Sequence, residues 1–190
     1  MNQPIVITDV LDNNLFVYLN ETLHEYSKWR FSNRSYDGGT PSWGYNSDLD
    51  SQLLFFEAAS IIKIKVQRHI KKNIHLCKIH CNGQTSGQTC QFHEDFELDD
   101  TWTFVLFTEL YWSTQWGGEF VSQHPESKKY YFVPYIPNTG ALIPSNWQHY
   151  GQSPNANTQK LRTTMAFSYM EENLFHEELK VDRSLYLRYT

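Results

Sequence analysis

The chain has 190 residues, of which 40% are hydrophobic and 16% aromatic, and its formal net charge is −5. This length suits one domain, and the aromatic content is too high for an intrinsically disordered protein, so we expect one folded unit over residues 1–190. The acidic balance argues against a protein that binds mainly nucleic acid phosphates. The chain lacks both a run of about 18 apolar residues and a basic, apolar start, so we expect neither a membrane segment nor a secretory signal.

The three cysteines, Cys77, Cys81 and Cys90, are an odd and sparse set without a CxxC pair. This pattern argues against a secreted fold that depends on disulfides. We interpret them as partly buried free thiols in a reducing compartment.

Residues 1–72 are predicted to form a helical support. Asp12 is a suitable N-cap, and apolar residues follow it at steps of three or four, as in a helix with one buried stripe. The members of this stripe are Leu15, Leu19, Leu23 and Tyr26. Residues 32–50 are polar and rich in glycine, which predicts a long loop. A second helix is predicted around residues 53–65, ending in a basic segment that we interpret as solvated.

From residue 73 to residue 169 the pattern changes to short strands separated by turns. About eight strands without helices between them favour a sandwich or jelly roll over a parallel α/β sheet. Six of these strands are expected at residues 74–79, 101–111, 119–122, 130–135, 141–144 and 162–169. The acidic extension over 170–190 is predicted to include a short outer helix. The predicted fold class is therefore α+β, with N-terminal helices and a β core.

His93 and Asp95 are two residues apart in the segment that follows a turn-rich stretch. Side chains at this spacing leave the same face of a strand, so both can point to one place while Glu94 points away. Joined by another histidine, such a pair forms the two-His, one-carboxylate set that holds ferrous iron and leaves positions open. Alone, the pair is weak evidence in a chain with eight histidines.

Two other histidines precede a carboxylate at the same spacing, in His124-Pro125-Glu126 and in His176-Glu177-Glu178. The proline disfavours a strand at the first position, and the second lies in the predicted outer helix with no histidine after it. We interpret both as surface residues.

The third candidate ligand is His149, which follows a short apolar strand. Arg162 then opens a mostly apolar strand, where a buried guanidinium is costly unless it meets an anion. A dicarboxylate suits this role because a guanidinium can donate two hydrogen bonds to one carboxylate. Two simpler interpretations stay open: His149 as a hydrogen-bonded core residue, and Arg162 as a charge on an edge strand.

The order of these segments resembles a known family. It comprises His93-x-Asp95, a Trp-Gly-Gly-Glu-Phe segment at residues 116–120, a strand-turn-strand segment over 133–144, then His149 and Arg162. Together they resemble the iron(II)- and 2-oxoglutarate-dependent oxygenases, and more narrowly the prolyl 4-hydroxylase-like branch with its small bacterial and phage members. The resemblance covers about half of the chain, residues 74–169, and depends on the joint order of the motifs.

The resemblance implies a double-stranded β-helix, which is a jelly roll of two sheets with a metal at its open mouth. His93, Asp95 and His149 would bind Fe(II). Arg162 would bind the distal carboxylate of 2-oxoglutarate, and Thr164, two residues further on, would be a second contact on the same face.

The implied activity is that of a dioxygenase that hydroxylates an unactivated C–H bond. O2 and 2-oxoglutarate are the cosubstrates, succinate and CO2 the coproducts, and ascorbate a supporting reductant. The resemblance favours a prolyl or other peptidyl side chain of a peptide or protein as substrate, and a cytoplasmic location, that of the host for a phage protein. Two alternatives stay open: a nucleobase or nucleic-acid oxygenase with the same iron centre, and a non-catalytic jelly-roll binding or virion module.

Three further observations concern the surroundings of the predicted site. Phe107 stands where related hydroxylases commonly place a tyrosine that contacts the cosubstrate, so one hydrogen bond would be missing. The adjacent glycines at 117 and 118 are interpreted as a turn. Three aromatic residues of the predicted loop form either a lid over a peptide groove or a clasp between helices and β core. They are Tyr36, Trp43 and Tyr45, of which Trp43 and Tyr45 are the candidate substrate contacts.

Overall fold

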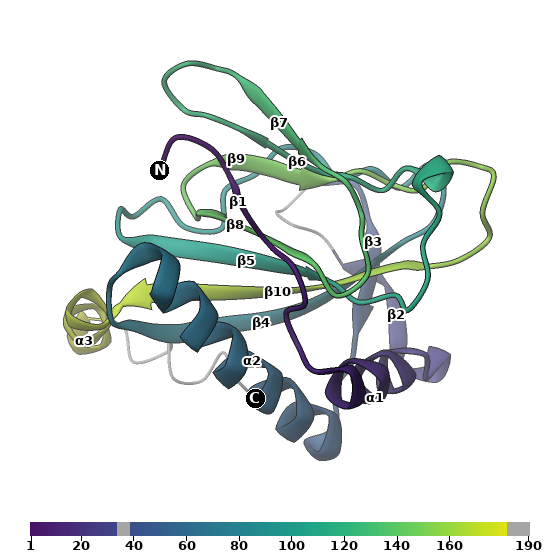
Figure 1. The fold of residues 1–190 in the computed structure, drawn as a ribbon, viewed down its shortest axis with the longest axis horizontal. Helices are drawn as coiled ribbons and strands as arrows, with labels where there is room; N and C mark the ends of the chain where they lie inside the picture. The colour runs from purple at the N-terminus through teal and green to yellow at the C-terminus, as the bar shows by residue number, and fades with distance from the viewer. Residues whose placement is uncertain (34–38, 182–190) are drawn as a thin grey trace.

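A computed structural model of the chain describes residues 1–33 and 39–181 (Figure 1). Its helices are α1 (Asn13–Leu23), α2 (Leu49–Ile70) and α3 (Glu172–Val181), with short 3-10 helices at Tyr26–Lys28 and Thr114–Trp116. Its strands are β1 (Ile5–Ile7), β2 (Trp29–Asn33), β3 (Ser42–Tyr45), β4 (Ile74–Gln84), β5 (Thr101–Phe107), β6 (Phe120–Gln123), β7 (Tyr130–Val133), β8 (Gly140–Pro144), β9 (Gln148–Gly151) and β10 (Arg162–Glu171). Among the described helices, none is long and apolar enough to cross a membrane.

The strands form two antiparallel sheets. The larger sheet has the order β1-β8-β5-β10-β4-β3-β2, and the smaller sheet has the order β7-β6-β9. Figure 1 shows α1 and α2 on one side of the larger sheet and the smaller sheet on the other side. The prediction of N-terminal helices packed on a largely antiparallel β core is confirmed.

Side chains of the sequence itself set the helix boundaries. Asp12 caps α1 by accepting hydrogen bonds from the backbone N–H groups of Asn14 and Leu15, as predicted. Asp48 caps α2 in a reciprocal capping box with Ser51. These caps fix where each helix begins and hence which of its faces meets the sheet.

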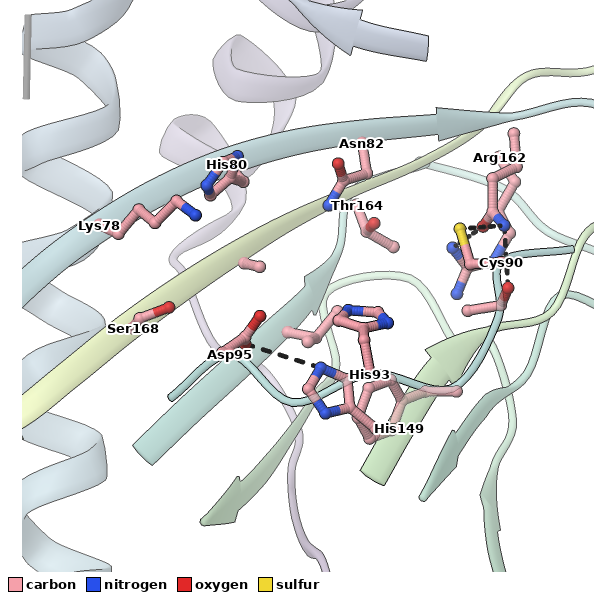
Figure 2. A pocket seen from close by; sticks show the side chains of 15 residues that line it. Lys78, His80, Asn82, Cys90, His93, Asp95, His149, Arg162, Thr164 and Ser168 are labelled. Atoms are coloured by element: carbon pink, nitrogen blue, oxygen red, sulfur yellow. Dashed lines mark hydrogen bonds and ion pairs between the residues drawn. The ribbon is translucent and has the colours of Figure 1, made fainter. Parts of the chain in front are cut away.

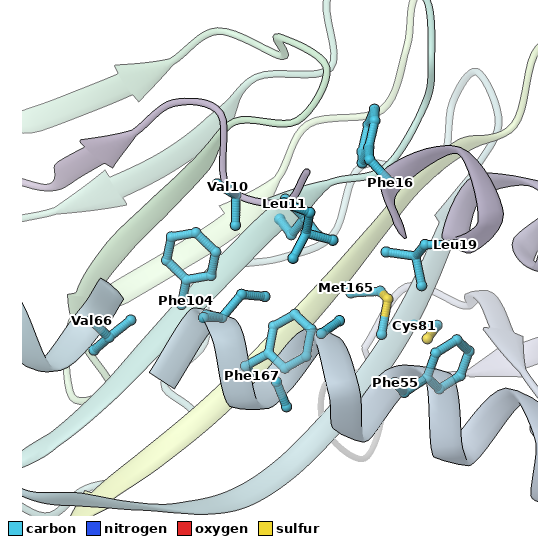
Figure 3. Packing of buried hydrophobic residues seen from close by; sticks show 14 of the residues in the cluster. Val10, Leu11, Phe16, Leu19, Phe55, Val66, Cys81, Phe104, Met165 and Phe167 are labelled. Carbon is cyan, nitrogen blue, oxygen red and sulfur yellow. The ribbon is translucent and has the colours of Figure 1, made fainter. Parts of the chain in front are cut away.

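The main hydrophobic core lies between these helices and the larger sheet (Figure 3). Leu19 of α1 and Ile62 of α2 are fully buried there, against Phe104 of β5 and Phe167 of β10. Each such side chain contributes about 1.5–3 kcal/mol through burial. The core therefore holds the inner strands of the larger sheet rigidly, and the opposite face of the same strands is free to carry polar groups.

The structure corrects the prediction for residues 32–50. This segment contains β3 and the beginning of α2, and residues 34–38 lie outside the described part. β3 forms because its backbone pairs with β2 and β4, and this tertiary pairing overrides the local turn signals. Tyr26, predicted in the buried stripe, is 65% exposed because α1 already ends at Leu23. Residues 1–72 thus supply three strands as well as two helices. A further difference lies in the β core, where the structure contains β9, which was not predicted.

Gly140 of β8 provides the space that Phe104 occupies in the core. A Cβ atom at position 140 would lie 2.1 Å from Cζ of the Phe104 ring. We expect Gly140→Ala to lower the free energy of unfolding by about 1–3 kcal/mol, as measured by urea denaturation. In the Phe104→Leu background the same glycine substitution should cost less, and an equal cost in both backgrounds would contradict this account.

A buried carboxyl group lies where α1 meets the β core. Glu109 is 2% exposed and accepts a 2.6 Å hydrogen bond from Oγ1 of Thr163, and its other oxygen lies 3.6 Å from Nε2 of His24. Burial raises the pKa of Glu109, although the hydrogen bond from Thr163 and the charges of His24 and Lys160 oppose this shift. The group is therefore costly to keep ionised.

Glu109→Gln should stabilise the protein more at high pH than at low pH. A carboxyl group whose pKa rises on folding contributes stability below its unfolded pKa, about 4.3, and loses it as the pH rises through the folded pKa. The amide has no such loss, so the free energy of unfolding of the variant minus that of the wild type should increase from about pH 4 to about pH 8 in urea denaturation. Glu57→Gln, on the exposed face of α2, is the control, and a difference that shrinks with pH would contradict the expectation.

Candidate metal centre

His93, Asp95 and His149 converge in a cavity between the two sheets (Figure 2). One ligand atom from each residue lies within 4.8 Å of the others. Nε2 of His149 is 3.6 Å from Oδ2 of Asp95, and the two imidazole centroids are 4.5 Å apart. The three residues predicted to act together from the sequence are thus adjacent in the structure.

Backbone pairing explains this convergence. His93 and His149 form an isolated antiparallel bridge in which each backbone N–H donates to the carbonyl oxygen of the other, at 3.1 and 2.9 Å. The backbone N–H of Asp95 donates to the carbonyl oxygen of Ser145 at 3.0 Å. The segment around His93 is therefore extended, so its two functional side chains point the same way, as their spacing predicted.

Hydrogen bonds to the backbone orient both histidine rings. Nδ1 of His93 lies 2.9 Å from the carbonyl oxygen of Gln91, and Nδ1 of His149 lies 2.8 Å from that of Trp147. A carbonyl oxygen only accepts, so Nδ1 of each ring carries the proton and Nε2 keeps its lone pair. This is the arrangement in which a histidine binds a metal through Nε2.

The charge state of the cluster also suits a divalent cation. Burial opposes ionisation of Asp95, but His149, the 2.5 Å hydrogen bond from Oγ1 of Thr103 and His93 outweigh it and hold the pKa of Asp95 below its usual value. Burial, reinforced by His149, lowers the pKa of His93. A metal requires an ionised carboxylate and neutral imidazoles, and the directions of the pKa shifts of Asp95 and His93 agree with this requirement.

The donor set itself indicates which metal fits. Two histidines and one carboxylate, with open positions, are typical of non-haem ferrous sites. Within residues 1–33 and 39–181, no fourth histidine, cysteine or acidic side chain joins the cluster. A metal held by these three residues would keep positions for other ligands.

Arg162 lies at the other end of the cavity and is 2% exposed. Its Nε donates to the carbonyl oxygen of Gly118 at 2.7 Å, and its Nη1 donates to Oε1 of Gln84 at 2.8 Å. Its Nη2 is buried and has no hydrogen-bond partner in the described part of the chain. Burial lowers the pKa of Arg162, yet a guanidinium stays charged in proteins. A buried charged donor without an acceptor is costly, so an anion in the cavity would satisfy it.

Two glycines make room for this guanidinium. A Cβ atom would lie 3.1 Å from Cδ of Arg162 at Gly118, and 3.1 Å from its Nη1 at Gly151. Gly117 and Gly118 have φ angles of 69° and 87°, a conformation that glycine adopts more readily than other residues, as expected for this pair. Gly118 therefore serves both needs, because it adopts a positive φ angle and, with Gly151, leaves space for the arginine.

β10 and β4 build one wall of the cavity from two rows of side chains. Paired across the two strands are Arg162 with Gln84, Thr164 with Asn82, Ala166 with His80, and Ser168 with Lys78, and all eight line the cavity. Thr164 thus lies on the predicted face. The contribution of β4 was missed, although its polar and apolar residues alternate over 78–84, because alternation does not reveal which face is turned to solvent.

The other predicted residues lie outside this wall. Trp43 and Tyr45 belong to β3 and pack against the main core, and the hydroxyl of Tyr45 donates to the carbonyl oxygen of Thr22 at 2.9 Å. These contacts favour the clasp, and a role for the two residues in substrate binding stays a prediction. Tyr36 lies outside the described residues. Phe107 is fully buried and stacks on Tyr135. Because phenylalanine has no hydroxyl group, it cannot supply the hydrogen bond expected of a tyrosine at this position.

The two rival histidines are also away from the cavity. Nδ1 of His124 accepts hydrogen bonds from the backbone N–H groups of Glu126 and Ser127, both at 3.3 Å. His176 lies exposed on α3. Neither residue lines the cavity or belongs to the triad.

No protein-family model and no curated protein sequence matches the chain, but solved structures do. A prolyl hydroxylase from Trichoplax adhaerens, in complex with a peptide fragment of the hypoxia inducible factor oxygen degradation domain, aligns over 91% of this chain and 86% of its own, with a TM-score of 0.68 and 15% identity. A prolyl-4-hydroxylase from Pseudomonas putida aligns over 90% and 94%, with a TM-score of 0.67 and 10% identity. The chain has the fold of the 2-oxoglutarate- and iron(II)-dependent oxygenases. The resemblance inferred from the sequence is thus confirmed at the level of the fold.

Neighbours with this oxygenase fold differ in the molecules that they bind. HygX from Streptomyces hygroscopicus, with nickel, 2-oxoglutarate and hygromycin B bound, aligns over 89% of this chain and 83% of its own, with a TM-score of 0.65 and 11% identity. The Trichoplax hydroxylase is bound to a peptide instead. Structures with this fold therefore bind molecules of different classes, and the substrate of this chain must be argued from its own residues.

Proposed function

We propose that the chain is a single-domain Fe(II)- and 2-oxoglutarate-dependent dioxygenase that hydroxylates an unactivated C–H bond, and that its two sheets form a double-stranded β-helix. One observation carries this proposal. A two-His, one-carboxylate cluster and a buried arginine with an unpaired Nη2 lie in the same cavity. The cluster fits ferrous iron, and the arginine fits the distal carboxylate of a diacid.

Each residue has a defined task in this proposal. His93, Asp95 and His149 would hold the iron, which when bound supplies the oxidative chemistry: one atom of O2 enters the product alcohol, and the other enters succinate as 2-oxoglutarate loses CO2. Arg162 would bind the distal carboxylate, and Thr164 lies one position further along the same wall. Gln84 and the carbonyl oxygen of Gly118 hold the guanidinium in place through its Nη1 and Nε.

A prolyl or other peptidyl side chain is the proposed target. Two of the similar structures are prolyl hydroxylases, and one of these contains a peptide. This analogy supports a peptide or protein partner. The proposal also includes ascorbate as supporting reductant and a reaction in the cytoplasm. No observation on the described residues favours a nucleic-acid substrate over a peptide.

The proposal is tested with Fe(II), ascorbate, O2 and labelled 2-oxoglutarate. We expect succinate to form slowly without substrate and faster when a peptide library is added, with a mass increase of 16 in the hydroxylated peptides, the mass of one oxygen atom. Absence of both succinate formation and Fe(II) binding would overturn the proposal in favour of a non-catalytic module. Succinate formation that only single-stranded nucleic acid stimulates would favour the nucleic-acid alternative.

A further inference from the structure

We propose that Tyr135 is a positioning residue for the cosubstrate, because its ring holds the guanidinium of Arg162 in the orientation that presents Nη2 to the distal carboxylate of 2-oxoglutarate. This inference rests on the proposed function, which assigns Arg162 to the cosubstrate. Tyr135 lies in the connection between β7 and β8 and is not among the described residues that line the cavity. Its effect on the cosubstrate therefore passes through Arg162.

The two hydrogen bonds of Arg162 leave its guanidinium one freedom of movement. Nε donates to the carbonyl oxygen of Gly118, and Nη1 donates to Oε1 of Gln84. The N–H groups of a guanidinium lie in its plane, so these bonds hold one edge of the group. A tilt about this edge displaces Nη2 most, and Nη2 is the nitrogen that has no hydrogen-bond partner among the described residues.

The ring of Tyr135 restrains this tilt. Cζ of Arg162 lies over the ring, 5.3 Å from its centroid, and both side chains are buried. The quadrupole of an aromatic ring attracts a cation within about 6 Å of its centroid, most strongly where water is excluded. The ring is therefore a third contact beside the two hydrogen bonds, and three contacts fix a plane that two leave free to turn.

The ring is itself held in place by its surroundings. The hydroxyl of Tyr135 donates to the carbonyl oxygen of Thr163 at 2.5 Å and accepts from the backbone N–H groups of residues 108 and 109 at 3.1 and 3.0 Å. Phe107 stacks on the ring, with 4.7 Å between the centroids. The hydroxyl thus ties the ring to the backbone beside Arg162, and Phe107 acts on the cosubstrate site through packing.

The role proposed for Tyr135 requires a fixed orientation of the guanidinium and no excess of positive charge. The carboxylate of Glu119 acts on Arg162 and balances part of its charge. A carboxylate is nevertheless bound through directed hydrogen bonds, which weaken steeply when donor and acceptor are misaligned. The direction of Nη2 therefore decides how tightly the cosubstrate binds.

The test measures 2-oxoglutarate binding by calorimetry on protein loaded anaerobically with Fe(II). Tyr135→Leu removes the ring and should weaken binding by about tenfold while Fe(II) affinity stays unchanged. Tyr135→Phe keeps the ring, so its affinity should stay within about threefold of the wild type. Its urea midpoint should fall, because the backbone groups bonded to the hydroxyl lose a partner. A purely structural role would instead make affinity fall with stability in both variants.

Tyr169→Leu is the matched control. Tyr169 is also a buried tyrosine, and its hydroxyl donates to the carbonyl oxygen of Ala59 at 3.2 Å in the main core. The substitution should lower the urea midpoint and leave 2-oxoglutarate affinity unchanged. An equal loss of affinity in Tyr169→Leu and Tyr135→Leu would contradict the inference.

A fluorinated ring at position 135 tests the attraction without removing the ring. Pentafluorophenylalanine has nearly the shape of phenylalanine, but fluorine withdraws electrons and makes the ring face positive, so it should bind 2-oxoglutarate about tenfold more weakly than Tyr135→Phe. Equal affinity of these two variants would overturn the inference, while loss of 2-oxoglutarate binding in Arg162→Met would leave the proposed function intact. Failure of the wild-type protein to bind 2-oxoglutarate would refute both.

Discussion

His149→Ala is expected to abolish Fe(II) binding and 2-oxoglutarate turnover while the chain stays folded. The imidazole supplies one of only three donors in the cluster, whereas the bridge to His93 uses backbone atoms that the substitution keeps. Loss of an outer partner of a metal ligand alone costs about 10–100-fold, so loss of a ligand should lower turnover by more than about 100-fold. Anaerobic Fe(II) titration, the succinate assay and circular dichroism measure the three properties.

The matched control is His176→Ala. This histidine is also followed two residues later by a glutamate, but it lies exposed on α3. Its substitution should leave Fe(II) affinity and turnover unchanged. Turnover of the His149→Ala variant at the wild-type rate would show that His149 is not a ligand.

Arg162→Met should weaken 2-oxoglutarate binding by at least about 100-fold without changing Fe(II) affinity. A hydrogen bond to a charged group contributes about 1.5–3 kcal/mol, and a bidentate guanidinium makes two of them to one carboxylate. The cluster of His93, Asp95 and His149 keeps its hydrogen bonds, since none of them involves Arg162. The KM for 2-oxoglutarate in the succinate assay and anaerobic calorimetry measure the effect.

Arg162→Lys separates charge from geometry. Lysine keeps the positive charge but lacks the planar fork, so its KM should lie between those of the wild type and the methionine variant. Thermal unfolding of each variant shows whether the core is intact, because Arg162 also donates to Gly118 and Gln84. An identical KM in all three proteins would exclude Arg162 as the anchor of the cosubstrate.

The pair of His93 and Asp95 was accessible from sequence because its geometry is local, whereas His149 was assigned from its place after a short apolar strand and from the order of the motifs. His93 and Asp95 are neighbours in an extended segment, and the ladder partner of this segment contains the remaining ligand, His149. Arg162 was accessible because a charge in an apolar strand requires a counterpart. The pair was found from short-range spacing and Arg162 from the cost of burial, and neither of these depends on the rest of the fold.

The end of the cavity that Lys78 and His80 line could not be predicted in the same way. The alternation that places Lys78 and His80 on one face of β4 is equally compatible with a face turned to water, and only the pairing with β10 decides between them. Likewise β3 follows residues that favour turns, and its strand conformation depends on partners distant in sequence. Local sequence patterns therefore do not reveal which face of a strand is turned to the cavity or which distant strands pair with each other.

Glycine at position 151 has a consequence for cosubstrate selection. It shares β9 with His149, two residues away, so one short strand carries both a metal ligand and the space for the guanidinium of Arg162. Two residues of strand span about 7 Å, and the pairing of β9 with β6 fixes this distance. In the proposed site β9 therefore sets the distance between the metal ligand His149 and the guanidinium of Arg162. A dicarboxylic acid one methylene shorter or longer than 2-oxoglutarate would then lose its contact either with the metal or with Arg162.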